Sequence, residues 1–192
     1  MTSKGAWRAR LRRARRELDG AARAAAEAQL NARLLDLADA VGARIVAIYS
    51  AAGSEADPGP FAAAWRARGG VTAYPRVASA EAMTLARVDA ASDLTPGFRG
   101  VLEPAAACVE VPVGDVDLVV VPGLGFAADG RRLGQGGGFY DRLLAAPERR
   151  ALAVGFAFGL QVVDGIPTEG HDVVLDAIVT ERGVARGGVW TL

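Results

Sequence analysis

The chain has 192 residues, a length that suits one compact domain with a single sizeable core. Hydrophobic residues make up 51% of it and charged residues 23%, which is a globular composition and excludes a disordered chain. Lys and Arg together number 22, as do Asp and Glu, so no overall basic field argues for a nucleic-acid partner.

The single cysteine, Cys108, excludes an intramolecular disulfide and suits a reducing compartment. In its alanine- and valine-rich segment it is either a small apolar filler or a nucleophile. No apolar run reaches the roughly 18 residues of a spanning helix, and the first residues lack the apolar region of an export signal. We therefore expect a cytoplasmic protein with no membrane partner.

Residues 3–18 are predicted to form an amphipathic helix. Its apolar positions recur every three or four residues: Trp7, Leu11, Ala14 and Leu18. Lys4, the sole lysine, stacks with Arg8 and Arg12 on a neighbouring face. This basic face is a solvated surface, an RNA-binding surface or a dock for a polyphosphate. We favour the polyphosphate for Lys4 and Arg8 and expect the later arginines to be mostly solvated, because Trp7 is the only aromatic residue nearby.

Helices and strands then alternate along the chain. A second helix is predicted over 21–41, with Asp19 suited to cap it, and further helices are predicted over 60–68 and 139–145. Strands are predicted over 45–49, 71–74, 83–88, 119–121, 151–158 and 177–180, with the second ended by Pro75. This alternation predicts one α/β domain over residues 1–192, with a largely parallel sheet flanked by helices.

Two loops between these elements have open roles. Glu55 lies in a polar loop after the first strand, where open α/β sheets place ligands. It either accepts hydrogen bonds from an amino-substituted heterocycle or, like Asp57, only starts the next helix. The turn-rich connection over 95–104 is either a lid or an inert surface loop.

The most informative stretch is the glycine-rich loop after the strand 119–121. Four glycines fall within five residues: Gly134, Gly136, Gly137 and Gly138. Residues without a Cβ let peptide N–H groups approach a ligand closely, and the helix from Phe139 directs its positive end to the same place. The loop is either a flexible connector or a site for an anion such as phosphate. The flanking Arg131, Arg132 and Asp141 favour the anion site.

The common nucleotide motifs are absent or weak. No G-x-x-x-x-G-K-[ST] occurs, which excludes an ordinary P-loop. Residues 123–128 fit a loose G-x-G-x-x-A, but Asp129-Gly130 follows where a helix should begin. Asp141 either complements the helix dipole or binds magnesium, and Asp172 is a possible second magnesium ligand. His171, the only histidine, is either structural or functional, and its isolation argues against a histidine metal cluster.

Taken in order, these motifs resemble the 5-formyltetrahydrofolate cyclo-ligase family. Lys4 with Arg8 is similar to its K-x-x-x-R, residues 54–57 to its S-E-x-D, and residues 100–104 to its G-x-x-E-P. The segment VPGLGFAADGRRLGQGGGFYDR resembles its most diagnostic block, and Gln161, Pro167, Glu169, His171-Asp172 and Thr180-Glu181 fit its C-terminal pattern. One departure is Phe158-Gly159, where the family often has Tyr-Glu, which leaves any hydroxyl or carboxylate contact there in doubt.

The resemblance implies a ligase that uses ATP and Mg²⁺ to convert 5-formyltetrahydrofolate to 5,10-methenyltetrahydrofolate. It also implies a fold related to the sugar-phosphate isomerase and CoA-transferase group. We further expect a monomer that binds no nucleic acid. The implied catalytic residues are Lys4, Arg132 and Asp141, and the implied magnesium ligands are Asp141 and Asp172. The implied ATP-binding residues are Lys4, Arg8, Arg132, Leu133, Gly134, Gln135, Gly136, Gly137, Gly138, Phe139 and Tyr140. The implied folate-binding residues are Glu55, Gln135, Gly136, Gly137, Gly138 and Phe139.

Two alternatives compete with this function. A non-catalytic sensor of a phosphorylated metabolite needs the glycines and arginines but not Asp141 together with Asp172. An RNA-binding module needs the basic first helix, and its binding should weaken steeply with salt.

Overall fold

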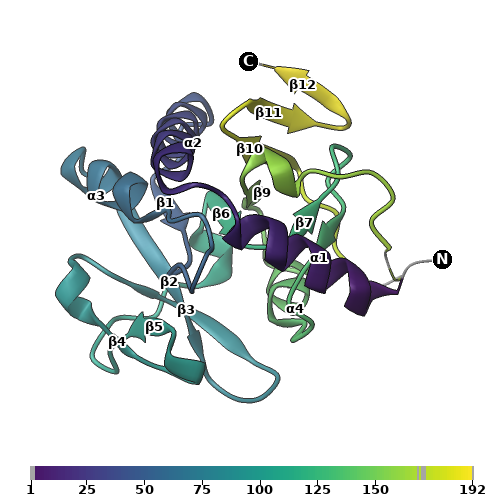
Figure 1. Cartoon of the computed structure of the whole chain (residues 1–192). Coiled ribbons are helices and arrows are strands. Elements are labelled where there is room, and N and C mark those ends of the chain that lie inside the picture. Colours follow the sequence, from purple (N-terminus) through teal and green to yellow (C-terminus); the bar gives the residue numbers. More distant parts are fainter. Residues whose placement is uncertain (1–2, 168, 170–171, 192) are drawn as a thin grey trace.

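The protein is described here from a computed structural model that covers residues 3–167, 169 and 172–191 (Figure 1). Its α-helices are α1 (Lys4–Arg16), α2 (Gly20–Ala40), α3 (Gly59–Ala67) and α4 (Phe139–Leu144). Its strands are β1 (Ile45–Ala47), β2 (Val71–Val77), β3 (Met83–Arg87), β4 (Leu94–Pro96), β5 (Leu102–Pro104), β6 (Leu118–Val121), β7 (Gly125–Phe126), β8 (Arg132–Leu133), β9 (Leu152–Phe156), β10 (Ala177–Thr180), β11 (Gly183–Arg186) and β12 (Val189–Thr191).

A central sheet joins eight of these strands in the order β12-β11-β10-β9-β6-β1-β2-β3. The five inner strands, from β10 to β2, pair in parallel, whereas β3, β11 and β12 add antiparallel pairs at the two edges. The largely parallel sheet predicted from the sequence is therefore confirmed. The connections leave β1 and β6 in opposite directions along the sheet, a place where open α/β sheets bind ligands.

Apolar residues cover both faces of the sheet, as the continuous apolar runs of the inner strands require. In β6, Leu118 and Val120 pack on the side of α2 and α3, while Val119 and Val121 pack on the side of α4. Figure 1 shows α2 and α3 side by side and α4 apart from them. The Asp19 side chain accepts a hydrogen bond from the Ala21 amide at 3.1 Å, which confirms the predicted cap of α2.

Helix α1 has a small core of its own. Leu11 is 2% exposed and packs with Leu124, Leu133 and Ile166, which belong to the segments after β6 and β9. This apolar contact seats α1 against the glycine-rich loop, so the basic side chains of the helix are placed by packing and not by charge alone.

Strand β2 continues past the predicted end at Pro75. Thr72 accepts a hydrogen bond from the Val88 amide, so every second residue of β2 bonds to β3, and Pro75 falls at a position that does not. On its other side β2 pairs with β1 only as far as Ala73. A missing N–H at Pro75 therefore removes no ladder bond.

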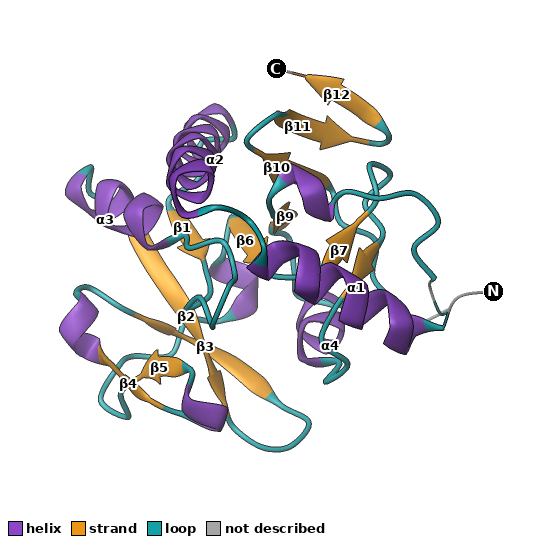
Figure 2. Cartoon of the chain, in the orientation of Figure 1, coloured by secondary structure: helices purple, strands orange, loops and turns teal. Residues whose placement is uncertain are grey.

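The hairpin β4–β5, over residues 94–104, forms most of the turn-rich connection and was not predicted from the sequence. Figure 2 shows the hairpin beside β2 and β3. The Arg76 side chain of β2 fastens it by donating to the Ala105 carbonyl at 3.2 Å. The strands β7, β8, β11 and β12 were also not predicted.

Candidate active site

A cavity of about 950 Å³ opens at the carboxyl ends of β1, β2 and β6. Tyr49 and Ser50 follow β1, Pro75 lies near the end of β2, and Pro122 and Gly123 follow β6. Every residue predicted for ATP, folate or magnesium lines this one cavity: Lys4, Arg8, Glu55, Arg132, Leu133, Gly134, Gln135, Gly136, Gly137, Gly138, Phe139, Tyr140, Asp141 and Asp172.

The glycine-rich loop needs its glycines for its backbone shape. Gly136 and Gly138 have φ angles of 104° and 68°, which side-chain-bearing residues rarely adopt. Two arginines hold the loop by its carbonyl groups, since Arg8 donates to Gly134 and Arg142 to Gly137, each at 3.0 Å. Within the described residues, the amide N–H groups of 134–138 donate to no protein acceptor. Five backbone donors are therefore available to a ligand in the cavity.

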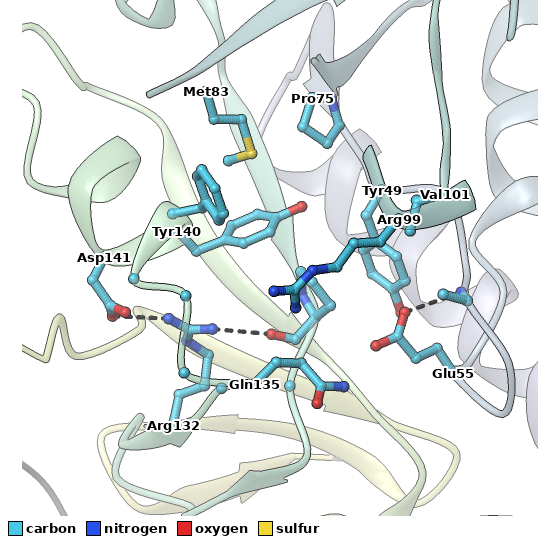
Figure 3. Close-up of a pocket in the computed structure, with 18 of the residues that line it drawn as sticks. Tyr49, Glu55, Pro75, Met83, Arg99, Val101, Arg132, Gln135, Tyr140 and Asp141 are labelled. Carbon is cyan, nitrogen blue, oxygen red and sulfur yellow. Dashed lines mark hydrogen bonds and ion pairs between the residues drawn. The ribbon is translucent and has the colours of Figure 1, made fainter. Parts of the chain in front are cut away.

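Arg132 and Asp141 form a shielded ion pair at the base of this loop (Figure 3). The Arg132 guanidinium donates to Asp141 at 2.8 Å and to the Pro122 carbonyl at 3.2 Å. The two side chains are 7% and 20% exposed. Asp141 lies in the first turn of α4, so the predicted complement to the helix dipole and the predicted metal role both remain open.

Lys4, the first residue of α1, also lines the cavity. Its ammonium group lies 3.0 Å from Asp172 and 3.1 Å from Glu169. Burial opposes the charge, but the hydrogen bonds and negative charges of these two carboxylates raise the pKa of Lys4. Lys4 is therefore a cation throughout the neutral range.

Glu55 lies inside the cavity and does not cap α3. Its carboxylate accepts a hydrogen bond from the Ala52 amide at 3.1 Å (Figure 3). Asp57 instead accepts from the Gly59 amide at 2.8 Å and so takes the local role at the start of α3. Burial, and then the charge of Glu55, raise the pKa values of Tyr49 and Tyr140. These phenols therefore stay protonated at neutral pH.

The expectation that the later arginines of α1 are mostly solvated is wrong for Arg15. Its side chain is 5% exposed and donates to Ser54 at 3.1 Å and to the Gly123 carbonyl at 3.4 Å. Its guanidinium also lies 3.8 Å from the Glu55 carboxylate. Burial lowers the pKa of Arg15. Arg15 thus joins α1 to the loop that carries Glu55.

Several cavity residues were not selected from the sequence. Arg12 donates to the Gln135 side chain at 2.8 Å, and Glu169 pairs with Lys4. The hairpin β4–β5 also borders the cavity. Of the two alternatives for this connection, a lid or an inert surface loop, this position favours the lid. Its lining residues are Phe98, Arg99, Val101, Leu102 and Glu103. Only Glu103, within the G-x-x-E-P motif, gave a signal in the sequence.

At Phe158-Gly159, where the sequence differs from the Tyr-Glu common in the family, the backbone amide of Gly159 still has a hydrogen-bond partner. The Gly159 amide donates to Glu181 at 2.7 Å, and a Cβ at this glycine would lie 2.7 Å from the same carboxylate. Gln161 is buried and donates to the Gly123 and Leu124 carbonyls, which fixes the turn after β6.

Two further predicted candidates are not part of the cavity as described. Cys108 lies in the turn after β5, with its sulfur 3.7 Å from the Asp93 carbonyl, and does not line the cavity. His171 is outside the described residues. In the described part of the chain, no helix combines the length and the apolar character that crossing a membrane would require.

A sequence profile of the 5-formyltetrahydrofolate cyclo-ligase family matches residues 1–181. The 5-formyltetrahydrofolate cyclo-ligase of Escherichia coli K12 is 32% identical over 162 residues, which cover 81% of this chain and 88% of the relative. The mitochondrial 5-formyltetrahydrofolate cyclo-ligase of Arabidopsis thaliana is 36% identical over 120 residues, which cover 53% of this chain.

The chain spans less than half the length of some curated relatives, 43% of the Arabidopsis protein and 44% of the mouse protein. Among solved structures, the NMR structure of Aquifex aeolicus 5,10-methenyltetrahydrofolate synthetase has a TM-score of 0.85 and 30% sequence identity. That match covers 98% of this chain and 95% of the Aquifex chain. The sheet order and its helical layers are therefore shared with a solved protein over almost the whole chain.

Proposed function

Because the chain belongs to the 5-formyltetrahydrofolate cyclo-ligase family, we propose that it uses ATP to cyclise 5-formyltetrahydrofolate to 5,10-methenyltetrahydrofolate. ADP and phosphate are released, and the protein acts as a ligase of folate one-carbon metabolism. The observation that carries this proposal is the run of uncommitted amide groups at 134–138, which lies in one cavity with Lys4, Arg132 and Glu55.

The chemistry suits a site that has no protein nucleophile. The formyl oxygen attacks the γ-phosphoryl group of ATP, and ADP leaves. The neighbouring amine nitrogen of the folate then bonds to the formyl carbon and loses its proton, and the carbon–oxygen bond breaks with phosphate as the leaving group. Such a reaction asks the protein mainly to align the reactants and to stabilise charge on the moving phosphoryl group.

The cavity offers groups for both tasks. In this proposal Lys4, Arg8 and Arg132 bind the ATP phosphates together with the glycine-loop amides. Leu133 and Tyr140 border the nucleotide, and Gln135 to Phe139 lie between the two substrates. Glu55 accepts hydrogen bonds from the amino group and ring N–H of the pterin. Its carboxylate suits this role because one oxygen accepts from the Ala52 amide, while the other lies 3.8 Å from the Arg15 guanidinium, beyond hydrogen-bond distance.

The carboxylates of the cavity fit a magnesium ion. Mg²⁺ takes oxygen ligands and commonly binds through one or two carboxylates together with substrate phosphates. Asp141 and Asp172 are two such groups and both line the cavity, and no cluster of three or more His, Cys, Asp or Glu side chains suited to a metal occurs among the described residues. We propose that both carboxylates hold Mg²⁺, which neutralises phosphate charge when bound.

A direct assay tests the proposed activity. Purified protein mixed with 5-formyltetrahydrofolate, ATP and Mg²⁺ should accumulate the absorbance of the methenyl product, with one ADP formed per product. Omitting ATP should abolish the signal. No product above the enzyme-free control at saturating substrates would contradict catalysis.

The same assay separates the proposal from the two rivals. A phosphometabolite sensor would bind ATP or another phosphate without turnover. An RNA-binding module would need the basic side chains of α1 to be free, whereas Lys4, Arg8, Arg12 and Arg15 all bond to groups in and around the cavity. We therefore keep RNA binding as the weaker alternative.

We also propose that residues 1–192 form one domain, because strands from both halves of the chain join one sheet. A cytoplasmic location and a monomeric state remain predictions. The Arabidopsis relative is named as mitochondrial, and size-exclusion chromatography with light scattering would measure the oligomeric state.

A further inference from the structure

The tip of the β4–β5 hairpin is a tight turn whose residues line the cavity. The Gly97 amide donates to the Val101 carbonyl at 2.8 Å and closes the turn. The Glu103 carboxylate accepts from the Phe98 amide at 3.1 Å and from the Val77 amide of β2 at 3.3 Å. One carboxylate thus ties the tip of the hairpin to the end of a sheet strand, so the residues at the tip have a fixed place beside the cavity.

Arg99 occupies this tip in an unusual conformation. Its φ of 56° and ψ of 26° are left-handed, and within the described part of the chain it is the one non-glycine residue with a positive φ. Such conformations cost free energy and concentrate at ligand-binding sites. Figure 3 shows the Arg99 side chain extending into the cavity among Tyr49, Gln135 and Tyr140.

The guanidinium of Arg99 differs from the other cations of the cavity. Lys4 pairs with Asp172, Arg8 and Arg12 bond to the glycine loop, and Arg132 pairs with Asp141. Among the described residues, the Arg99 side chain makes neither a hydrogen bond nor an ion pair, and its guanidinium carbon lies 5.1 Å from the centroid of the Phe98 ring. Its donors are therefore available to an anionic ligand.

The surroundings of Arg99 indicate which anion it meets. Phe98 packs edge-on against Phe139 with 6.1 Å between the ring centroids, and Phe98 and Leu102 are 42% and 46% exposed. The part of the cavity lined by the hairpin therefore offers an exposed apolar surface, Phe98 and Leu102, beside the cation of Arg99. A flat aromatic ring that carries a carboxylate matches these two features, because its ring can pack on the apolar surface while its carboxylate meets the cation.

We propose that Arg99 pairs with a carboxylate of the glutamate tail of the folate substrate, while its aminobenzoyl ring packs near Phe98. This inference rests on the proposed function and adds a subsite to it. A guanidinium binds a carboxylate with two parallel hydrogen bonds, so Arg99 determines the preference for a substrate with an anionic tail.

Kinetics with two substrates test this subsite. With 5-formyltetrahydrofolate, Arg99→Gln should raise KM about tenfold, the usual effect of losing one charge-assisted hydrogen-bonded pair, and leave KM for ATP unchanged. Arg99→Lys should restore part of the affinity. With the 5-formyltetrahydropteroyl amide, which has an uncharged amide in place of glutamate, wild type and Arg99→Gln should have equal KM values.

Arg68→Gln is the matched control, because Arg68 is 54% exposed, pairs with Asp39 and does not line the cavity. Equal KM values of Arg99→Gln and wild type for the folate would overturn the subsite, and so would a rise confined to KM for ATP, which would assign the guanidinium to phosphate. A wild-type protein without turnover would instead contradict the proposed catalysis. Calorimetric titration with 5-formyltetrahydrofolate would still compare Arg99→Gln with wild type, and equal affinities there would also overturn the subsite.

Discussion

At the scale of single residues, the Arg132–Asp141 pair is the most informative part of the site. Arg132 keeps a second bond to the Pro122 carbonyl, so the loss of the Asp141 charge need not unfold the loop. We predict that Asp141→Asn lowers kcat at least about 100-fold, because electrostatic groups at the moving phosphoryl account for effects of this size. The melting temperature should change little, and the Mg²⁺ concentration required for activity should rise.

Asp129→Asn is the control for this substitution. Asp129 pairs with Arg131 at the same distance, 2.8 Å, but the pair is largely exposed and lies outside the cavity. Its substitution should leave both kcat and the Mg²⁺ requirement unchanged. Wild-type activity of Asp141→Asn would remove Asp141 from the metal site and leave it only the role of positioning Arg132.

Arg15 is buried against Ser54 and Glu55, in the loop that is proposed to bind the pterin. We predict that Arg15→Met lowers the free energy of unfolding by about 3 kcal/mol, because Glu55 loses its buried cationic partner and Ser54 and the Gly123 carbonyl each lose a hydrogen bond. KM for the folate should rise more than KM for ATP, because Arg15 holds the loop that carries Glu55, the proposed pterin-binding residue. Urea unfolding compares this variant with Arg16→Met, which changes the exposed neighbouring residue. Equal stability of the two variants would show that the Arg15 contacts are not stabilising.

At the scale of elements, the site depends on how α1 is seated. Leu11 fills the small core beneath α1, so Leu11→Ala should lower the free energy of unfolding by about 2–5 kcal/mol. Because α1 carries Lys4 and Arg8, KM for ATP should rise at temperatures where the protein is still folded. Leu30→Ala in the main core should destabilise the protein similarly and leave KM for ATP unchanged. If both variants alter ATP binding equally, the seating of α1 has no special role.

At the scale of the whole molecule, the sequence predicted the parallel centre of the sheet better than its edges. The inner strands are apolar runs buried on both faces, and this pattern is readable without knowledge of the partners. The strands β7 and β8 have two residues each, and β11 and β12 exist only because each pairs with a neighbour. Short strands of this kind depend on tertiary pairing, which local sequence does not encode.

The same distinction holds for the site. The glycine loop and its flanking charges are close in sequence, so their joint role was predictable. Arg15 and Arg99 acquire their roles from loops far along the chain, Arg15 from residues 54–55 and 123 and Arg99 from the cavity that the hairpin borders. Arg15 was expected to be solvated with the other later arginines, because the helix sequence alone does not distinguish a buried charged face from an exposed one.

In the proposed function, the amides of residues 134–138 hold the triphosphate of ATP next to the folate. The most direct test is a crystal structure with a non-hydrolysable ATP analogue, Mg²⁺ and 5-formyltetrahydrofolate. We predict the phosphates within hydrogen-bonding distance of these amides, Lys4 and Arg132, with the pterin at Glu55. Nucleotide bound away from this loop, with the five amides facing solvent, would contradict the account.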